Sequence, residues 1–109
     1  MSLIFHITST ADWEEAKRRG AYAADSLSRE GFIHCSDRHQ VIEVANRLFR
    51  GRDDLLLLTI DRERLSPDVR YENLEGGSEL YPHVYGAIAV DAVVEVAALT
   101  PGDDGRYTP

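Results

Sequence analysis

The amino-acid sequence predicts a single α+β domain with two main helices. The chain has 109 residues, close to the commonest size of one domain, and its 43% of hydrophobic residues suffices for one core. The helical patterns gather in the first half of the chain and the strand patterns in the second, an order typical of α+β folds rather than of doubly wound sheets. We assign the domain to residues 1–100 and expect residues 101–109 to form a flexible C-terminal tail.

The first strand and the first helix are predicted from alternation and capping. Leu3–Thr8 alternates between two faces, as a strand does. A helix follows between Thr10, whose hydroxyl suits an N-cap, and Gly20, a usual helix end. Trp13 is expected to anchor this helix in the core.

The next segment is harder to assign. Residues 22–30 fit a helix and a strand equally well, with Leu27 as the expected buried side chain. Gly31–Cys35 predicts a second strand, in which Cys35 faces the core and His34 faces the other way.

The clearest helix follows this strand. Ser36 or Asp37 caps it and Gly51 closes it. We assign no functional role to His39, which lies in this helix. The helix has an apolar stripe at 3.6-residue spacing, formed by Val41, Val44, Ala45, Leu48 and Phe49.

The rest of the chain is mostly extended. The continuous apolar run Leu55–Ile60 predicts a central strand that is buried on both faces. The other expected elements are a helical turn at 61–65, strands at 69–74 and 93–99, a loop at 75–78 and an extended segment at 81–86.

Charge and composition restrict the partners of the chain. Twelve basic and nineteen acidic side chains give a net charge of -7, which disfavours nucleic acid and anionic membranes. The run Lys17-Arg18-Arg19 is interpreted as a solvated helix end. The longest apolar run is too short to span a bilayer, and the N-terminus lacks the pattern of a signal peptide. With a single cysteine, Cys35, the sequence favours a cytoplasmic location.

Histidines recur with hydroxyl side chains at strand spacing. Side chains two apart in a strand point the same way. The groups related in this way are His6 with Thr8, His34 with Ser36, and His83 with Tyr81 and Tyr85. We predict that these imidazoles converge on one polar cleft. The alternative, that they are separate core histidines with satisfied hydrogen bonds, stays open.

Other reactive groups give weaker signals. Glu72 is the best-placed carboxylate for the cleft, although it also fits a charge that protects an edge strand. The histidines lack the close spacing of zinc motifs, so we predict no metal ligands. A buried Cys35 would be inert as a nucleophile.

Longer segments of the sequence match a known pattern. They are Phe5–Thr8 with Trp13, the string from Ser26 to Ser36, and Tyr81–Gly86. Together these segments resemble the uncharacterised bacterial family known as domain of unknown function 952, and the likeness covers nearly the whole chain. That family is in turn similar to the ADP-ribosyltransferase fold, which includes the RNA 2'-phosphotransferases.

The resemblance implies a small split, bent β-sheet that holds NAD, as a substrate, in a central cleft. It assigns the cofactor-binding positions to His6, Thr8, Ser36 and Tyr85, and the catalytic positions to His34, Glu72 and His83. Either Glu72 or His83 would fill the third motif. Two departures stand out: Ile7 replaces the glycine that follows the histidine in some relatives, and no arginine stands in the motifs.

These observations leave several functions open. The first is transfer of an ADP-ribosyl or ribosyl-phosphate group from NAD to a small acceptor or water, in which preorganised side chains stabilise the charge at the anomeric carbon. The second is a non-catalytic module that binds a nucleotide or a phospho-metabolite. The third is a metal-dependent hydrolase on His6, His34 and His83. The sequence does not indicate an oligomeric state.

Overall fold

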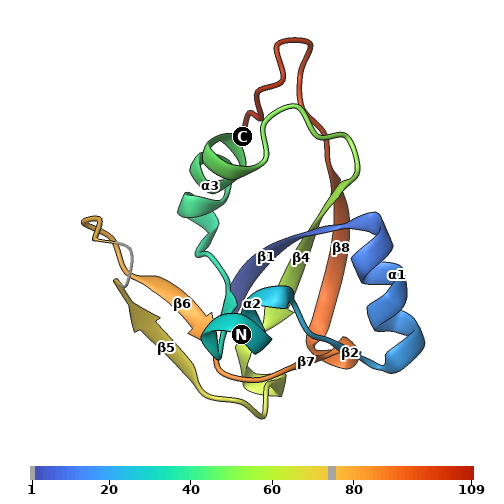
Figure 1. The fold of residues 1–109 in the computed structure, drawn as a ribbon, viewed down its shortest axis with the longest axis vertical. Coiled ribbons are helices and arrows are strands. Elements are labelled where there is room, and N and C mark those ends of the chain that lie inside the picture. The colour runs from blue at the N-terminus through green and yellow to red at the C-terminus, as the bar shows by residue number, and fades with distance from the viewer. Residues whose placement is uncertain (1, 74–75) are drawn as a thin grey trace.

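The computed structural model describes residues 2–73 and 76–109, and it has the mixed α+β architecture that the sequence predicts. Three small antiparallel sheets form the frame. The central sheet contains β1 (Leu3–Ser9), β4 (Leu55–Asp61) and β8 (Val93–Leu99), in the order β1-β4-β8 (Figure 1). Among the described residues no helix combines the length and apolar character needed to cross a membrane.

The strand β4 lies at the centre of this sheet, as its apolar run predicts. Leu55, Leu58 and Ile60 are all buried. Leu58 and Ile60 belong to a core cluster with Trp13, whereas Leu55 belongs to a second cluster with Phe5. The core is therefore divided between the two faces of the central sheet, since side chains alternate along a strand.

The helix α1 (Thr10–Arg19) packs against β1 and β4 and is buried there through Trp13. Gly20 ends it with a φ of 85°, as expected. The cap is Ser9 rather than Thr10: its side chain accepts a hydrogen bond from the backbone of Asp12. The prediction was wrong by one residue because β1 continues to Ser9, whose extended backbone suits the cap position.

The basic run at the end of α1 is a solvated helix end. Lys17 pairs with Glu14, and Arg18 and Arg19 both pair with Glu15. These pairs lie three or four residues apart on an exposed face, where such contacts add little stability.

The ambiguous segment forms a short strand and a short helix. The strand β2 (Ala21–Tyr22) pairs with β7 (Ile88–Ala89), and α2 (Asp25–Glu30) ends at Gly31. Leu27 is only partly buried, and the buried side chains of this segment are Tyr22 and Ser26.

The second predicted strand is shorter than expected. The strand β3 covers only Ile33–His34, because α2 and its Gly31 cap occupy the preceding residues. At Ser36 the chain leaves this sheet and pairs with Phe5 of β1 through two backbone hydrogen bonds of 2.7 and 2.8 Å. This bridge connects β3 to the central sheet.

The clearest helix begins with a 3-10 turn (Arg38–Gln40) and continues as α3 (Val41–Leu48). Asp37 caps the turn, and Gln40 completes a capping box. The helix ends at Phe49 rather than at Gly51, and Leu48 is 62% exposed although the stripe predicts it in the core. Phe49 at the end of the helix still packs against the core, whereas Leu48 lines a cavity, a difference that the apolar pattern cannot show.

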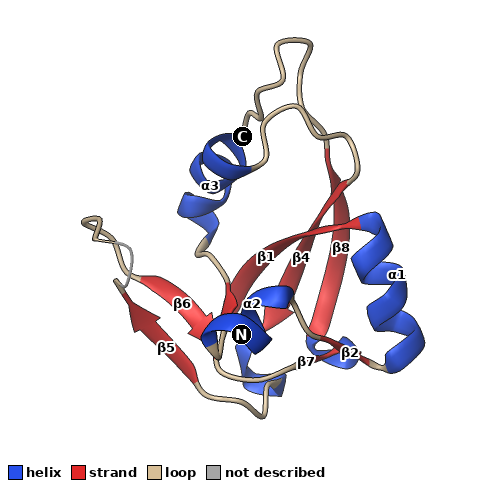
Figure 2. Cartoon of the chain, in the orientation of Figure 1, coloured by secondary structure: helices blue, strands red, loops and turns tan. Residues whose placement is uncertain are grey.

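The remaining elements form the third sheet and its connections. A 3-10 turn (Arg62–Arg64) leads to the hairpin of β5 (Val69–Glu72) and β6 (Tyr81–Val84), which pairs with β3 in the order β3-β6-β5. Figure 2 shows this hairpin projecting to one side of the central sheet. Of the strand predicted at 69–74, residue 74 lies outside the described residues, as does residue 75 of the predicted loop.

The last part of the chain differs from the expected flexible tail. After the 3-10 turn Val90–Ala92 and the edge strand β8, the chain returns to α3. Tyr107 is 2% exposed, and its hydroxyl donates to the carbonyl oxygens of Phe49 and Arg52. Its backbone exchanges hydrogen bonds with the side-chain amide of Asn46. The folded part of the chain therefore extends beyond residue 100, because one aromatic side chain anchors a polar segment.

Candidate functional site

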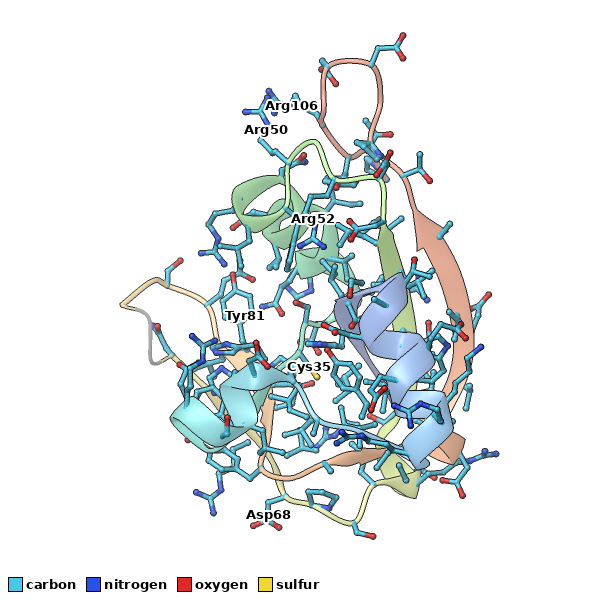
Figure 3. All side chains as sticks on the ribbon, turned by 45° about the vertical axis from the view of Figure 1, so that its right-hand side comes forward. Cys35, Arg50, Arg52, Asp68, Tyr81 and Arg106 are labelled. Carbon is cyan, nitrogen blue, oxygen red and sulfur yellow. The ribbon has the colours of Figure 1, made fainter. Side chains whose placement is uncertain are left out.

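A cavity of about 380 Å³ lies among β1, α2, β3 and α3. Its size falls in the range of small-molecule sites. The apolar part of its wall comes largely from Val44, Leu48 and Phe49. Its uncharged polar lining comes from separate elements of the fold and includes His6, Tyr22, Ser26, His34, Ser36 and Tyr81. Figure 3 shows Tyr81 on the side of the hairpin and Cys35 nearer the middle of the molecule. We call this cavity the central pocket.

The structure brings some of the predicted site residues together at this pocket and leaves others elsewhere. His6, His34 and Ser36 line it. The remaining predicted residues do not belong to its lining; they are Thr8, Glu72, His83 and Tyr85.

His6 lies on β1 and is 9% exposed. Its Nδ1 donates to the backbone carbonyl oxygen of His34 at 2.6 Å, and its Nε2 accepts from the hydroxyl of Tyr22 at 2.8 Å. Burial lowers the pKa of His6 to about 4. The ring is therefore neutral near pH 7, and its tautomer is set by these two contacts. Because both nitrogens are engaged by protein, the ring is built to hold the pocket wall together.

Tyr22 completes this arrangement from β2. Burial raises the pKa of its phenol to about 12, so the hydroxyl keeps its proton and donates it to His6. Tyr22 also lines the central pocket. The sequence gives no sign of this role, because only the fold brings Tyr22 of β2 next to His6 of β1.

His34 presents its side chain to the pocket from β3. Its Nε2 donates to Glu30 Oε2 at 3.0 Å, and about two fifths of its side chain is exposed. The same hydrogen bond holds the pKa of Glu30 below its ordinary value. Glu30 is the last residue of α2, so the short helix places a carboxylate beside the imidazole. A histidine oriented by a carboxylate is a common acid-base arrangement.

His83 belongs to a second polar cluster behind His34. The two histidines are cross-strand partners in β3 and β6, and their ring centroids are 5.2 Å apart. His83 is 1% exposed, and Phe32 stacks on its ring at 4.1 Å. Its Nδ1 donates to Glu72 Oε1 at 2.9 Å, and its Nε2 is buried with no partner among the described residues.

Glu72 is the acceptor at the centre of that cluster. Its Oε1 also accepts from the hydroxyl of Tyr85 at 2.5 Å. The hydrogen bonds from Tyr85 and His83 hold the pKa of Glu72 below its ordinary value. The hydrogen bond between Tyr85 and Glu72 in turn raises the pKa of the Tyr85 phenol. Glu72 therefore serves as the partner of His83 within the hairpin sheet, in addition to being a charge on an edge strand.

Cys35 is buried in the core, as predicted, and also contacts the pocket. Burial raises the pKa of its thiol, so the thiolate needed for nucleophilic attack does not form near neutral pH.

The donor set gives no support to a three-histidine metal site. Within residues 2–73 and 76–109, no group of three or more His, Cys, Asp or Glu side chains is arranged to hold a metal ion. His6 in addition has both ring nitrogens in hydrogen bonds to protein.

Two arginines line the pocket without any sign of this role in the sequence. Arg29 lies near the end of α2 and Arg47 near the end of α3, and both line the central pocket. In the sequence each is an ordinary basic residue in the last turn of a helix, a position that the helix dipole favours. Only the folded structure, in which residues of α2 and α3 line the same cavity, shows that the two arginines share it.

Fold and site together define a small α+β domain with antiparallel sheets and a pocket with polar and apolar lining beside its central sheet. The chain belongs to the family described as "Protein of unknown function (DUF952)", whose model matches residues 7–96.

Solved structures of one bacterial protein have the same fold. The crystal structure of protein CC0527 from Caulobacter crescentus is 35% identical to this chain and superposes with a TM-score of 0.88, covering 98% of this chain and 94% of that one. Its solution NMR structure is 36% identical, with a TM-score of 0.84 and coverage of 99% and 93%. No protein among the curated sequences matches the chain.

Proposed function

We propose that the central pocket binds a nucleotide, with NAD as the first candidate. The observation that carries this proposal is the meeting of His34, Ser36 and Tyr81 on one cavity of about 380 Å³ with a largely apolar wall. Nucleotides combine a flat aromatic base with hydroxyl-rich sugar and phosphate. A concave apolar site with a few convergent polar groups suits that combination.

Each wall of the pocket suits one part of such a ligand. Val44, Leu48 and Phe49 of α3 offer an apolar surface for a base. A site for a base would also account for Leu48, which is largely exposed without a ligand. His34 and Ser36, which also line the pocket, offer hydrogen bonds to ribose hydroxyls. His6 acts through Tyr22 and the His34 backbone and does not bind the ligand with its ring nitrogens.

A second candidate is catalytic use of the same site, and the His34–Glu30 contact favours it. In such a reaction the bond between nicotinamide nitrogen and the ribose anomeric carbon breaks, and nicotinamide leaves with the bonding electron pair. An acceptor oxygen, from water or a small alcohol, bonds to that carbon and gives its proton to the carboxylate-oriented histidine. The resemblance to the ADP-ribosyltransferase fold is part of this candidate, as is a cytoplasmic location, where nucleotides are available.

Calorimetric titration with NAD tests the proposal. His34→Gln should weaken binding by roughly tenfold, because it removes a ring that would bond the ligand. His39→Gln is the matched control: His39 also donates from Nε2 to a carboxylate at 3.0 Å, that of Glu79, but it does not line the pocket. Absence of NAD binding, or equal losses in both variants, would overturn the proposal. Release of nicotinamide from bound NAD would separate catalysis from binding alone.

A further inference from the structure

Arg29 and Arg47 bring positive charge to the central pocket from two different helices. Figure 1 shows α2 and α3 as separate helices, with α3 above α2 in that view. Both arginine side chains are exposed, so their guanidinium groups are available to a ligand that enters the pocket.

Within the described residues, neither arginine forms the kind of carboxylate ion pair that Arg19 and Arg52 form. Arg19 pairs with Glu15 at 2.6 Å, and Arg52 pairs with Asp54 at 2.7 Å. Within the described part of the chain, neither Arg29 nor Arg47 has a carboxylate at ion-pair distance. Asp25 and Glu43 stand four residues before Arg29 and Arg47 on the same helices, where an ion pair would be easy to form. Among the described residues, therefore, neither helix forms the ion pair that this spacing allows, although the charge of Arg29 interacts with the neighbouring carboxylate of Glu30.

The lining of the pocket carries a net positive charge on a strongly acidic chain, and the carboxylate of Glu30 lies beside it in a hydrogen bond with His34. The charged lining consists of Arg29 and Arg47 against one carboxylate, Asp25, whereas the chain as a whole carries -7. A concave site whose charge opposes that of the surrounding surface concentrates ligands of the opposite sign. The ligand class that this field selects is anionic.

The hydrogen-bond donors near the arginines favour phosphate among anions. Ser26 and Ser36 line the same cavity, and their hydroxyls can donate to oxygens that the guanidinium groups leave free. Phosphate offers several strong acceptor oxygens, which suits the planar forks of two arginines that arrive from different helices.

A neighbouring cavity limits where the phosphate can lie. This second cavity, of about 220 Å³, shares Arg47 and Tyr81 with the central pocket and is also lined by Glu43 and Glu79. Its carboxylates repel an anion, so the phosphate belongs on the side of Arg47 that faces the central pocket.

We infer that Arg29 and Arg47 form a phosphate subsite of the central pocket, which makes the protein select phosphorylated ligands over neutral nucleosides. This inference rests on the proposed function, because the phosphate belongs to the nucleotide bound in the same pocket. It adds a chemical selectivity that nucleotide binding alone does not require.

Paired titrations with adenosine and AMP test the subsite. In the unaltered protein AMP should bind at least roughly tenfold more tightly than adenosine, because charge-assisted hydrogen bonds are stronger than neutral ones. Arg29→Ala and Arg47→Ala should each remove most of this advantage and leave the affinity for adenosine unchanged. Arg50→Ala is the matched control: Arg50 is exposed, lies three residues after Arg47 and does not line the pocket.

The outcomes separate this inference from the proposed function. Equal affinities for adenosine and AMP, or an equal loss in Arg50→Ala, would overturn the phosphate subsite and leave nucleotide binding standing. If no nucleoside or nucleotide binds, inorganic pyrophosphate is the remaining probe, followed through the Nε–H signals of the arginines. A response confined to Arg29 and Arg47 would support the subsite without the nucleotide. No response would remove both proposals.

Discussion

The Nδ1 of His6 lies 2.6 Å from the backbone carbonyl oxygen of His34, which joins two residues that are 28 positions apart in the sequence. The contact connects β1 to β3 at the wall of the central pocket. It also requires His6 to carry its proton on Nδ1, which leaves Nε2 as the acceptor for Tyr22. His6 thus shapes the wall of the pocket, while the side chain of His34 lines the pocket itself.

Stability should fall in mild acid because of His6. Its pKa is lowered from 6.5 to about 4 in the folded protein, so the unfolded chain binds the proton more readily between these values. The stabilisation from neutral His6 is present above pH 6.5 and is lost as the pH falls towards 4. The full loss for this group is roughly 3 kcal/mol.

Urea unfolding at neutral pH and near pH 4 measures this dependence. Between neutral pH and pH 4, His6→Gln should lose less unfolding free energy than the unaltered protein, since the other titrating groups contribute equally to both. His39→Gln should behave like the unaltered protein. A pH dependence that is the same with and without His6 would contradict the account.

Removal of one hydroxyl should expose the role of Tyr22. Tyr22→Phe leaves the buried Nε2 of His6 without its donor, which should cost about 1–3 kcal/mol of unfolding free energy. Tyr71→Phe is a useful control, because the Tyr71 hydroxyl bonds Asp37 at an exposed position. A smaller loss for Tyr22→Phe than for Tyr71→Phe would show that the contact with His6 is unimportant.

Tyr107 should stabilise the folded protein, and its backbone amide should be protected from exchange with solvent. Tyr107→Ala removes a buried aromatic ring and should cost about 3 kcal/mol or more. The backbone N–H of Tyr107, which donates to Asn46 Oδ1 at 2.8 Å, should exchange slowly with solvent, whereas exposed Asp103 should exchange fast. Rapid exchange at Tyr107 would restore the expectation of a flexible tail.

Glu72 should matter more for the hairpin sheet than for the ligand. Glu72→Gln takes the charged acceptor away from His83 and Tyr85, so the thermal midpoint should decrease. The dissociation constant for NAD should stay unchanged, because Glu72 does not line the central pocket. If the variant kept its midpoint and lost NAD binding, Glu72 would return to the site that the family resemblance assigns to it.

Much of the fold could be predicted from local patterns. Alternation identified β1 and β8, and the apolar run of β4 indicated its central place, because burial on both faces leaves no polar positions. Caps located both main helices to within a few residues. The burial of Tyr107 in the expected tail and the exposure of Leu48 could not be predicted, because each depends on whether another segment covers the side chain, and no local pattern records that.

The site was predictable only in part. The pairing of His34 with Ser36 at strand spacing led to two pocket residues, although the chain leaves β3 between them. Tyr22, Arg29 and Arg47 could not be found in this way, because each meets the pocket through the packing of elements distant in sequence. His83 has the same strand spacing to hydroxyl side chains, but Phe32 stacks on its ring and it does not line the pocket. Residue spacing cannot show such a contact.

The most direct test of nucleotide binding at the central pocket follows the histidine rings themselves. NAD is titrated into protein that is isotope-labelled in its histidines, and the ring signals are recorded at each step. The account predicts that the His34 ring responds with saturation, while His39, outside the pocket, stays unchanged. A spectrum in which no ring responds at millimolar NAD, or in which only His39 does, would contradict it.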